Sequence, residues 1–272
     1  MKLNGIVITV AAAALLGVSL LCSADKPKDG KKKILLYSES LGFRHSVVAR
    51  PLSGEMAHAE KVFKEMCDKA GYEVHFSQSF HDLKDIKQFE NYDAIVFYTS
   101  GNPEINRQAM LDWLKAGGAF IGVHATTDSY RKDAETASGG KSTGWPEYIE
   151  IIGGAFSGHG KQDPNGVTIK IEDREHPATR MLGEEWIVVD EIYHHDRIFR
   201  DKIHVLMSVD TKKTNLEPQG MKPDGDYPLA WTNTYGQGRV FYTAMGHRED
   251  MWTNPTFQEH LLGGIAWALG KK

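Results

Sequence analysis

Four histidines in this sequence stand at positions where their side chains could act together. His124 directly follows an apolar run in GGAFIGVHATTD, His45 ends the loop GFRH after another apolar run, and His247 follows RVFYTAMG. His159 lies in the glycine-rich segment GGAFSGHG, which we expect to be a flexible loop. Imidazoles bind divalent metal ions and exchange protons near neutral pH. We therefore predict a metal site, with zinc as the expected ion, whose ligands are His45, His124, His159 and His247.

Each of these histidines taken alone has a second interpretation. A single histidine in a loop is as often a hydrogen-bonded structural residue as a ligand. The spacing of the histidines adds no support for a metal site, because neither HExxH nor CxxC occurs in the chain. It is the joint placement of the histidines after apolar runs that favours a shared site.

A second dense group of polar residues is the segment DEIYHHD at positions 190–196. Side chains of an extended segment alternate between two faces, so Glu191, Tyr193 and His195 share one face. The other face carries Asp190, Ile192 and His194. Because the isoleucine marks that face as partly core, we expect the first face to line a pocket. Glu191 or a histidine free of metal would transfer protons there, and the catalytic candidates are Glu191, His124 and Tyr193.

Aromatic side chains are frequent near these loops and indicate a class of ligand. The apolar C–H face of a sugar ring suits an aromatic ring, whereas its hydroxyl groups need polar partners. Packing in the core explains most aromatic residues equally well. The candidate substrate-binding residues are Arg44, Tyr130, Trp145, His195 and Trp252.

The histidines can meet only if the elements that precede them form one parallel sheet. Short apolar runs predict strands at residues 33–37, 73–76, 94–98 and 119–123. Helices are predicted at 55–70 and from the cap Asn102-Pro103 to residue 116. Alternating strands and helices form parallel sheets with right-handed crossovers. The carboxyl ends of such strands share one edge, where ligands bind.

The second half of the chain reads as an extension of this sheet. Further strands are predicted at 167–171, 187–189, 205–209, 229–232 and 239–243, the last two joined by the hairpin signal YGQG. Helices are predicted at 145–152 and 255–269, with a helical stub after the turn in HPATRML. No repeat or linker divides the chain, which predicts one α/β domain with an antiparallel extension.

The first 24 of the 272 residues have the pattern of a secretory signal peptide. A retained membrane anchor and lipidation at Cys22 are the alternatives, and residues 25–32 read as a polar tether. After cleavage Cys67 is the one remaining thiol, so an intramolecular disulfide is excluded. We expect a periplasmic or secreted protein without a stable membrane span. A net charge of −4 gives no basic field for nucleic acid.

Taken together, the motifs resemble the ThuA-like (trehalose-utilisation) family from about residue 33 to residue 269. The motifs are KILLYSESLGFRH, YDAIVFY, GGAFIGVHATTD, WPEYIEIIGGAFSGH, HPATRML, DEIY and PLAWTNTYGQGRVFYTAMGH. The resemblance implies a flavodoxin-like three-layer sandwich, similar to class I glutamine amidotransferases, over residues 33–270. It also implies a role in carbohydrate metabolism. The positions of this chain that match the family's motifs and are carried over as site residues are His45, His124, His159, Glu191, Tyr193 and His247. His194-His195 departs from the family pattern.

Two functions agree with these observations. The first is a metal-dependent enzyme that hydrolyses, hydrates or isomerises a sugar or keto-sugar. The second is a non-catalytic sugar-binding or accessory protein. Thiolate chemistry of the amidotransferase kind is not expected, because no cysteine lies near His124. Nicotinamide redox chemistry is not expected either, since no GxGxxG follows the first strand. The expected partner is a small carbohydrate, and a homo-oligomer is left open.

Overall fold

The computed structural model describes residues 30–271, and the part from residue 31 onward forms one compact unit. The expected signal peptide, with Cys22 inside it, and residues 25–29 of the tether lie outside the described residues. Across the described range, no helix combines the length and the apolar character needed to span a bilayer.

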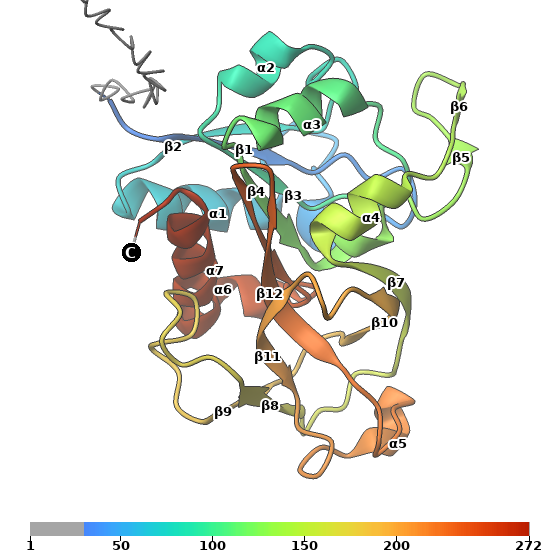
Figure 1. The fold of residues 1–272 in the computed structure, drawn as a ribbon, viewed down its shortest axis with the longest axis vertical. Helices are drawn as coiled ribbons and strands as arrows, with labels where there is room; N and C mark the ends of the chain where they lie inside the picture. The colour runs from blue at the N-terminus through green and yellow to red at the C-terminus, as the bar shows by residue number, and fades with distance from the viewer. Residues whose placement is uncertain (1–29, 272) are drawn as a thin grey trace, which may run out of the picture. The chain divides into compact units, whose positions relative to one another are not determined.

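Within the described residues, nine strands form one sheet in the order β2-β1-β3-β4-β13-β12-β11-β8-β9 (Figure 1). The first five run parallel: β2 (Glu73–Ser77), β1 (Lys33–Tyr37), β3 (Ala94–Phe97), β4 (Ala119–Val123) and β13 (Gly238–Thr243). The rest are antiparallel to their neighbours: β12 (Pro228–Tyr235), β11 (His204–Val209), β8 (Val167–Ile171) and β9 (Glu185–Val188). This arrangement confirms the predicted fold class.

Helices cover both faces of the sheet. Successive side chains of β4 and β13 point to opposite faces, so each face carries side chains that a helix must cover. Gly122 has no side chain, which leaves room for Ile152 of α4 (Pro146–Ile152) on one face. Phe241 lies on the other face and contacts Gly264 of α7 (Pro255–Ala268). Helices α1 (His58–Lys69) and α6 (Glu249–Thr253) pack with α7, and α2 (Ile86–Glu90) packs with α3 (Arg107–Lys115).

The predicted start of the helix after β3 is wrong by several residues. Helix α3 begins at Arg107, and its N-cap is Asn106, whose side chain accepts a hydrogen bond from the Ala109 amide. Asn102 instead donates its side-chain amide to the carbonyl groups of Lys132 and Ser142. The sequence holds two asparagines able to cap, and a tertiary contact occupies the first.

The segment GGAFSGHG, predicted as a loop, is strand β7 (Gly154–His159). It pairs with β10 (Tyr193–Ile198) in a separate antiparallel ladder. The predicted stub in HPATRML is a turn without a helix. Elements that the sequence pattern did not indicate are α2, α6, α5 (Leu216–Gln219), β5 (Ala134–Glu135), β6 (Lys141–Ser142) and the 3-10 turns η1 (Ser46–Val48) and η2 (His124–Asp128).

Candidate metal centre

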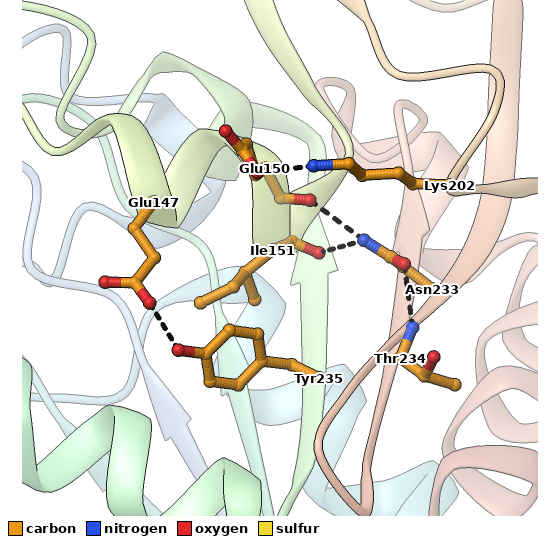
Figure 2. A pocket seen from close by; sticks show the side chains of 7 residues that line it. All are labelled: Glu147, Glu150, Ile151, Lys202, Asn233, Thr234 and Tyr235. Carbon is orange, nitrogen blue, oxygen red and sulfur yellow. Dashed lines mark hydrogen bonds and ion pairs between the residues drawn. The ribbon is translucent and has the colours of Figure 1, made fainter.

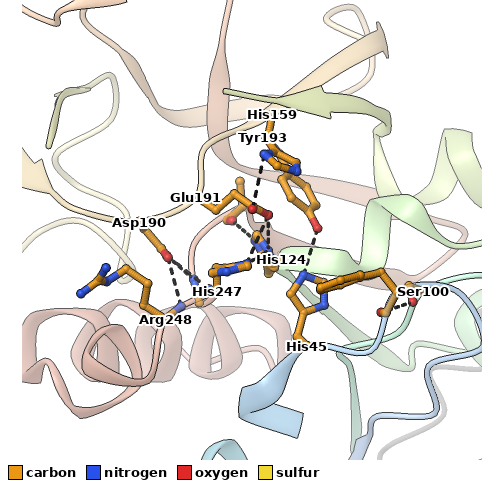
Figure 3. Close-up of polar contacts among 12 residues, drawn as sticks. His45, Ser100, His124, His159, Asp190, Glu191, Tyr193, His247 and Arg248 are labelled. Carbon is orange, nitrogen blue, oxygen red and sulfur yellow. Dashed lines mark hydrogen bonds and ion pairs between the residues drawn. The ribbon is translucent and has the colours of Figure 1, made fainter. Parts of the chain in front are cut away.

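Three histidines and one carboxylate converge at the carboxyl edge of the parallel strands (Figure 3). His45 follows β1, His124 follows β4, and His247 follows β13, so the parallel pairing of these strands carries all three to one edge. Glu191 comes from the segment just before β10. Each residue offers one potential ligand atom, and the four atoms lie within 4.8 Å of one another.

His124 occupies a strained turn directly after β4. Its φ is +44°, in the left-handed region that residues other than glycine seldom adopt. The Nδ1 atom lies 2.7 Å from the carbonyl oxygen of Ala244. Because a carbonyl only accepts, Nδ1 carries the proton and Nε2 presents its lone pair to the centre. A hydrogen bond of this kind orients most histidine ligands of metals.

His247 is positioned by the turn that ends β13. Gly246 adopts φ +115°, and a Cβ added there would lie 3.1 Å from the side chain of Val123. The carboxylate of Asp190 accepts hydrogen bonds from the Gly246 amide at 2.7 Å and the Arg248 amide at 3.1 Å. The Nδ1 atom of His247 then lies 3.3 Å from Nε2 of His124.

Glu191 is the negative group of the cluster. Its Oε2 atom lies 3.2 Å from Nδ1 of His247 and 3.5 Å from Nε2 of His124. Burial alone raises the pKa of Glu191, but its interactions with His124 and His247 outweigh burial and hold that pKa well below its ordinary value. The carboxylate is therefore anionic, the form that binds a cation.

His45 is the fourth member of the group. Its Nδ1 atom is buried and has no hydrogen-bond partner among the described residues. Burial, followed by the charges of His124 and His247, lowers the pKa of His45 to about 3. A neutral imidazole with an unpartnered nitrogen is the state that a metal ion requires. The four residues thus fit a divalent cation, and their three nitrogen donors and one oxygen donor suit zinc.

The structure places His159 beside this group and not inside it. His159 is the last residue of β7, and its Nδ1 lies 3.4 Å from Oε1 of Glu191. Nδ1 also lies 2.9 Å from the carbonyl oxygen of Gly160, to which it donates. The side chain is 45% exposed, whereas His124 is fully buried. The cluster in the structure thus differs from the predicted ligand set: Glu191 lies within it, and His159 lies beside it.

Comparison with known proteins agrees with the fold just described. Residues 33–268 match the sequence model of ThuA, described as trehalose utilisation. The chain belongs to the ThuA family. No curated protein sequence matches it significantly.

Solved structures share the architecture of this ThuA chain at low sequence identity. A ThuA-like protein from Bacteroides uniformis ATCC 8492 is 22% identical with a TM-score of 0.68, over 90% of this chain and 94% of that one. A ThuA-like protein from Parabacteroides merdae ATCC 43184 is 21% identical with a TM-score of 0.67, over 89% and 91%. A cytoplasmic protein from Salmonella typhimurium is 12% identical with a TM-score of 0.56, over 87% and 98%. At these identities the likeness concerns the fold.

Tyr193 lies against the cluster of four candidate ligands, on the face predicted from the alternation of side chains in DEIYHHD. Its ring centroid is 4.0 Å from that of His124, and its hydroxyl oxygen is 3.4 Å from Nε2 of His45. Burial first, and then nearby acidic and phenolic groups, raise the pKa of Tyr193 well above its ordinary value. The hydroxyl therefore stays protonated and can donate a hydrogen bond but not act as a base.

Three aromatic residues predicted to bind substrate lie in the core of the structure. Tyr130, Trp145 and Trp252 are all at most 6% exposed. The Tyr130 hydroxyl donates to the Pro103 carbonyl, and the Trp252 indole donates to the Gly246 carbonyl. All three rings pack against other side chains, and the polar atoms of Tyr130 and Trp252 already have partners, so these residues are part of the core.

The two polar candidates for substrate binding also point elsewhere. His195 is half-buried, and its Nε2 lies 3.2 Å from Oγ1 of Thr127. Burial, followed by the charge of His194, lowers the pKa of His195 to about 3. Arg44 is exposed and donates to the side chain of Gln78 at 2.7 Å. Neither contacts the four candidate ligands in the structure.

Asp190 is the functional residue that the sequence interpretation overlooked, because it placed this side chain on the core-facing side of its segment. The carboxylate is buried, yet it binds the backbone that carries His247. Burial raises the pKa of Asp190, and the charge of His124 and the Gly246 amide oppose that rise. No local pattern reports such a contact, since Asp190 and Gly246 lie 56 positions apart.

A separate surface pocket of about 430 Å³ lies between α4 and β12 (Figure 2). Its charged groups pair with one another: Lys202 with Glu150 at 2.5 Å, and the Tyr235 hydroxyl with Glu147. The Asn233 amide donates to two backbone carbonyls of α4. Because these groups already have partners, the pocket offers little to a polar ligand.

Proposed function

We propose that this ThuA chain is an exported metal-dependent enzyme that hydrolyses, hydrates or isomerises a sugar or keto-sugar derivative. The observation that carries the proposal is the group of four potential ligand atoms within 4.8 Å at the edge of the sheet. The carbohydrate substrate is supported by the family's role in trehalose utilisation. The periplasmic or secreted location is supported by the leader-like first 24 residues.

Side chains around the centre have distinct roles in this proposal. His45, His124, Glu191 and His247 hold the cation, and a zinc ion supplies Lewis-acid chemistry when bound. The Ala244 carbonyl keeps His124 in one tautomer. His159 donates through Nδ1 to Gly160, which leaves its Nε2 free to accept a proton from the substrate. Tyr193 donates a hydrogen bond through its hydroxyl.

The metal content tests the first half of the proposal. Protein purified without a metal-affinity tag and analysed for its elements is expected to hold about one zinc per chain. His124→Ala removes the most buried ligand and is expected to abolish that content. His81→Ala, which removes an exposed imidazole from a surface loop, is the matched control and should keep the metal. Wild-type protein without stoichiometric metal would disprove the centre.

Product analysis tests the second half. The zinc-loaded protein is incubated with trehalose and with a 3-keto-glucoside, and products are resolved by chromatography and NMR. Turnover that is lost in His159→Gln, with the metal retained, supports an enzyme with the roles given above. Calorimetric binding of a sugar without product, unaffected by a chelator, supports the sugar-binding alternative instead.

A further inference from the structure

One aromatic side chain remains exposed beside the centre. Among the described residues, the large apolar side chains with substantial exposure are Phe43, Leu52 and Ile187. Phe43 is 66% exposed, and its ring centroid lies 4.8 Å from that of His45, with the rings at 81°. Of the three, Phe43 is the one in ring contact with a candidate ligand.

The loop that carries Phe43 is held firmly to the sheet edge. The Ser100 hydroxyl donates to the Phe43 carbonyl at 2.7 Å, and the Leu41 amide donates to the Ser100 carbonyl at 3.0 Å. Gly101 adopts φ +74°, and a Cβ there would lie 2.7 Å from the Gly42 nitrogen. This close backbone contact fixes where the phenyl ring emerges, so its exposure does not come from a loose loop.

The size of the exposed apolar surface limits what can cover it. A protein interface buries about 800 Å² on each partner, far more than one phenyl ring offers. The neighbouring Arg44 is polar and exposed, so the phenyl group is not part of an apolar patch. One flat ring beside polar groups matches the C–H face of a single sugar ring, which leaves the sugar hydroxyls for polar partners.

We propose that Phe43 is the stacking residue of the site, on which one sugar ring of the substrate rests beside His45. This inference rests on the proposed function. It also assigns the aromatic contact to a residue of the β1 loop, since Tyr130, Trp145 and Trp252 are buried. The ligand class is a neutral pyranoside, because an aromatic face attracts apolar C–H groups without requiring charge.

The test measures sugar binding by calorimetry with zinc-loaded protein and a panel of trehalose, glucose and a 3-keto-glucoside. Phe43→Ala is expected to weaken binding of a bound sugar about five- to ten-fold, whereas Phe43→Trp should keep it within about three-fold. Leu52→Ala removes a comparable exposed apolar side chain elsewhere and should change nothing. Metal content should be the same in all three variants.

The outcomes separate this inference from the proposed function. Sugar binding that is equal in wild type and Phe43→Ala overturns the stacking role and leaves the proposed function intact. Absence of binding by the wild type to every sugar in the panel overturns both. Equal weakening in Phe43→Ala and Phe43→Trp also overturns the inference, because it indicates a steric role specific to phenylalanine.

Discussion

Histidine 124 combines three features that rarely occur in one residue. It is fully buried, its φ is +44°, and its ring is held by a backbone carbonyl. A residue other than glycine in this backbone conformation carries about 1–3 kcal/mol of strain. Such a conformation persists only where the surrounding structure enforces it. The turn after β4 therefore carries an imidazole, and the described cysteine, Cys67, is buried in α1.

Asp190 gives a prediction at the scale of single residues. Asp190→Ala removes the acceptor for the Gly246 and Arg248 amides and frees the turn that carries His247. Loss of such outer contacts typically weakens metal binding about 10- to 100-fold. Competition titration of zinc against a chelating dye measures this change. Asp226→Ala removes the exposed partner of Arg200 and is the control, expected to keep wild-type affinity. Equal affinities would show that Asp190 is not needed to position His247.

At the scale of elements, β7 and β10 show how a small ladder completes the centre. The ladder pairs Tyr193 with His159 across the two strands. That register places both side chains near Glu191, which precedes β10. The ladder therefore supplies the groups that surround the cluster, while the parallel sheet supplies the three histidines within it.

Helix α7 gives a prediction about packing. A Cβ on Gly263 would lie 2.2 Å from the carbonyl oxygen of Pro177, which is backbone and cannot move freely. Alanine usually stabilises a helix interior relative to glycine by about 1 kcal/mol. Here the collision outweighs that gain, and Gly263→Ala is expected to lower the free energy of unfolding by about 1–3 kcal/mol. Urea denaturation measures the difference.

The control for that substitution is another glycine with open space around it. A Cβ on Gly183 would meet no atom within 4 Å. Gly183→Ala should therefore leave the free energy of unfolding within about 0.5 kcal/mol of the wild type. If Gly263→Ala proves as stable as Gly183→Ala, α7 can shift away from the 176–182 turn, and the close packing described above is not rigid.

At the scale of the whole molecule, acid stability depends on histidines that the fold keeps neutral. His260 of α7 is buried, donates Nδ1–H to the Ala178 carbonyl at 2.7 Å, and has no partner for Nε2 among the described residues. Burial lowers the pKa of His260 to about 4 from an ordinary value near 6.5. Between those values the unfolded chain binds a proton that the folded chain does not, so stability falls as the pH falls.

This linkage predicts the size of the acid effect. Between pH 7.5 and pH 5, His260 alone is expected to lower the free energy of unfolding by about 2 kcal/mol. His260→Leu is less stable at pH 7.5 because the Ala178 carbonyl loses its donor. Its free energy of unfolding should, however, fall by about 2 kcal/mol less than that of the wild type between the two pH values. Urea denaturation of chelator-treated protein measures both. Ile265→Val, a core substitution on the same helix, should keep the wild-type pH dependence.

The sequence by itself determined the parallel strands and the identity of the histidines at their ends. Apolar runs at residues 33–37 and 119–123 are local signals, and the rule that parallel strands end at one edge does not depend on details of packing. For these reasons His45, His124 and His247 were expected together, and the structure brings them together. The family and the fold class followed from the order of the motifs.

Only the tertiary structure decided which neighbours join those histidines and which aromatic rings stay open. Glu191 lies in the cluster and His159 beside it because β7 pairs with β10, and the sequence signal for β7 was a run of glycines typical of loops. Trp145 is buried against Arg107 and Tyr130, and Phe43 is held in its exposed position by Ser100, so both depend on residues outside their own local segment. Periodicity reports the face of a strand or helix, whereas distance and solvent exposure are set by segments remote in the chain.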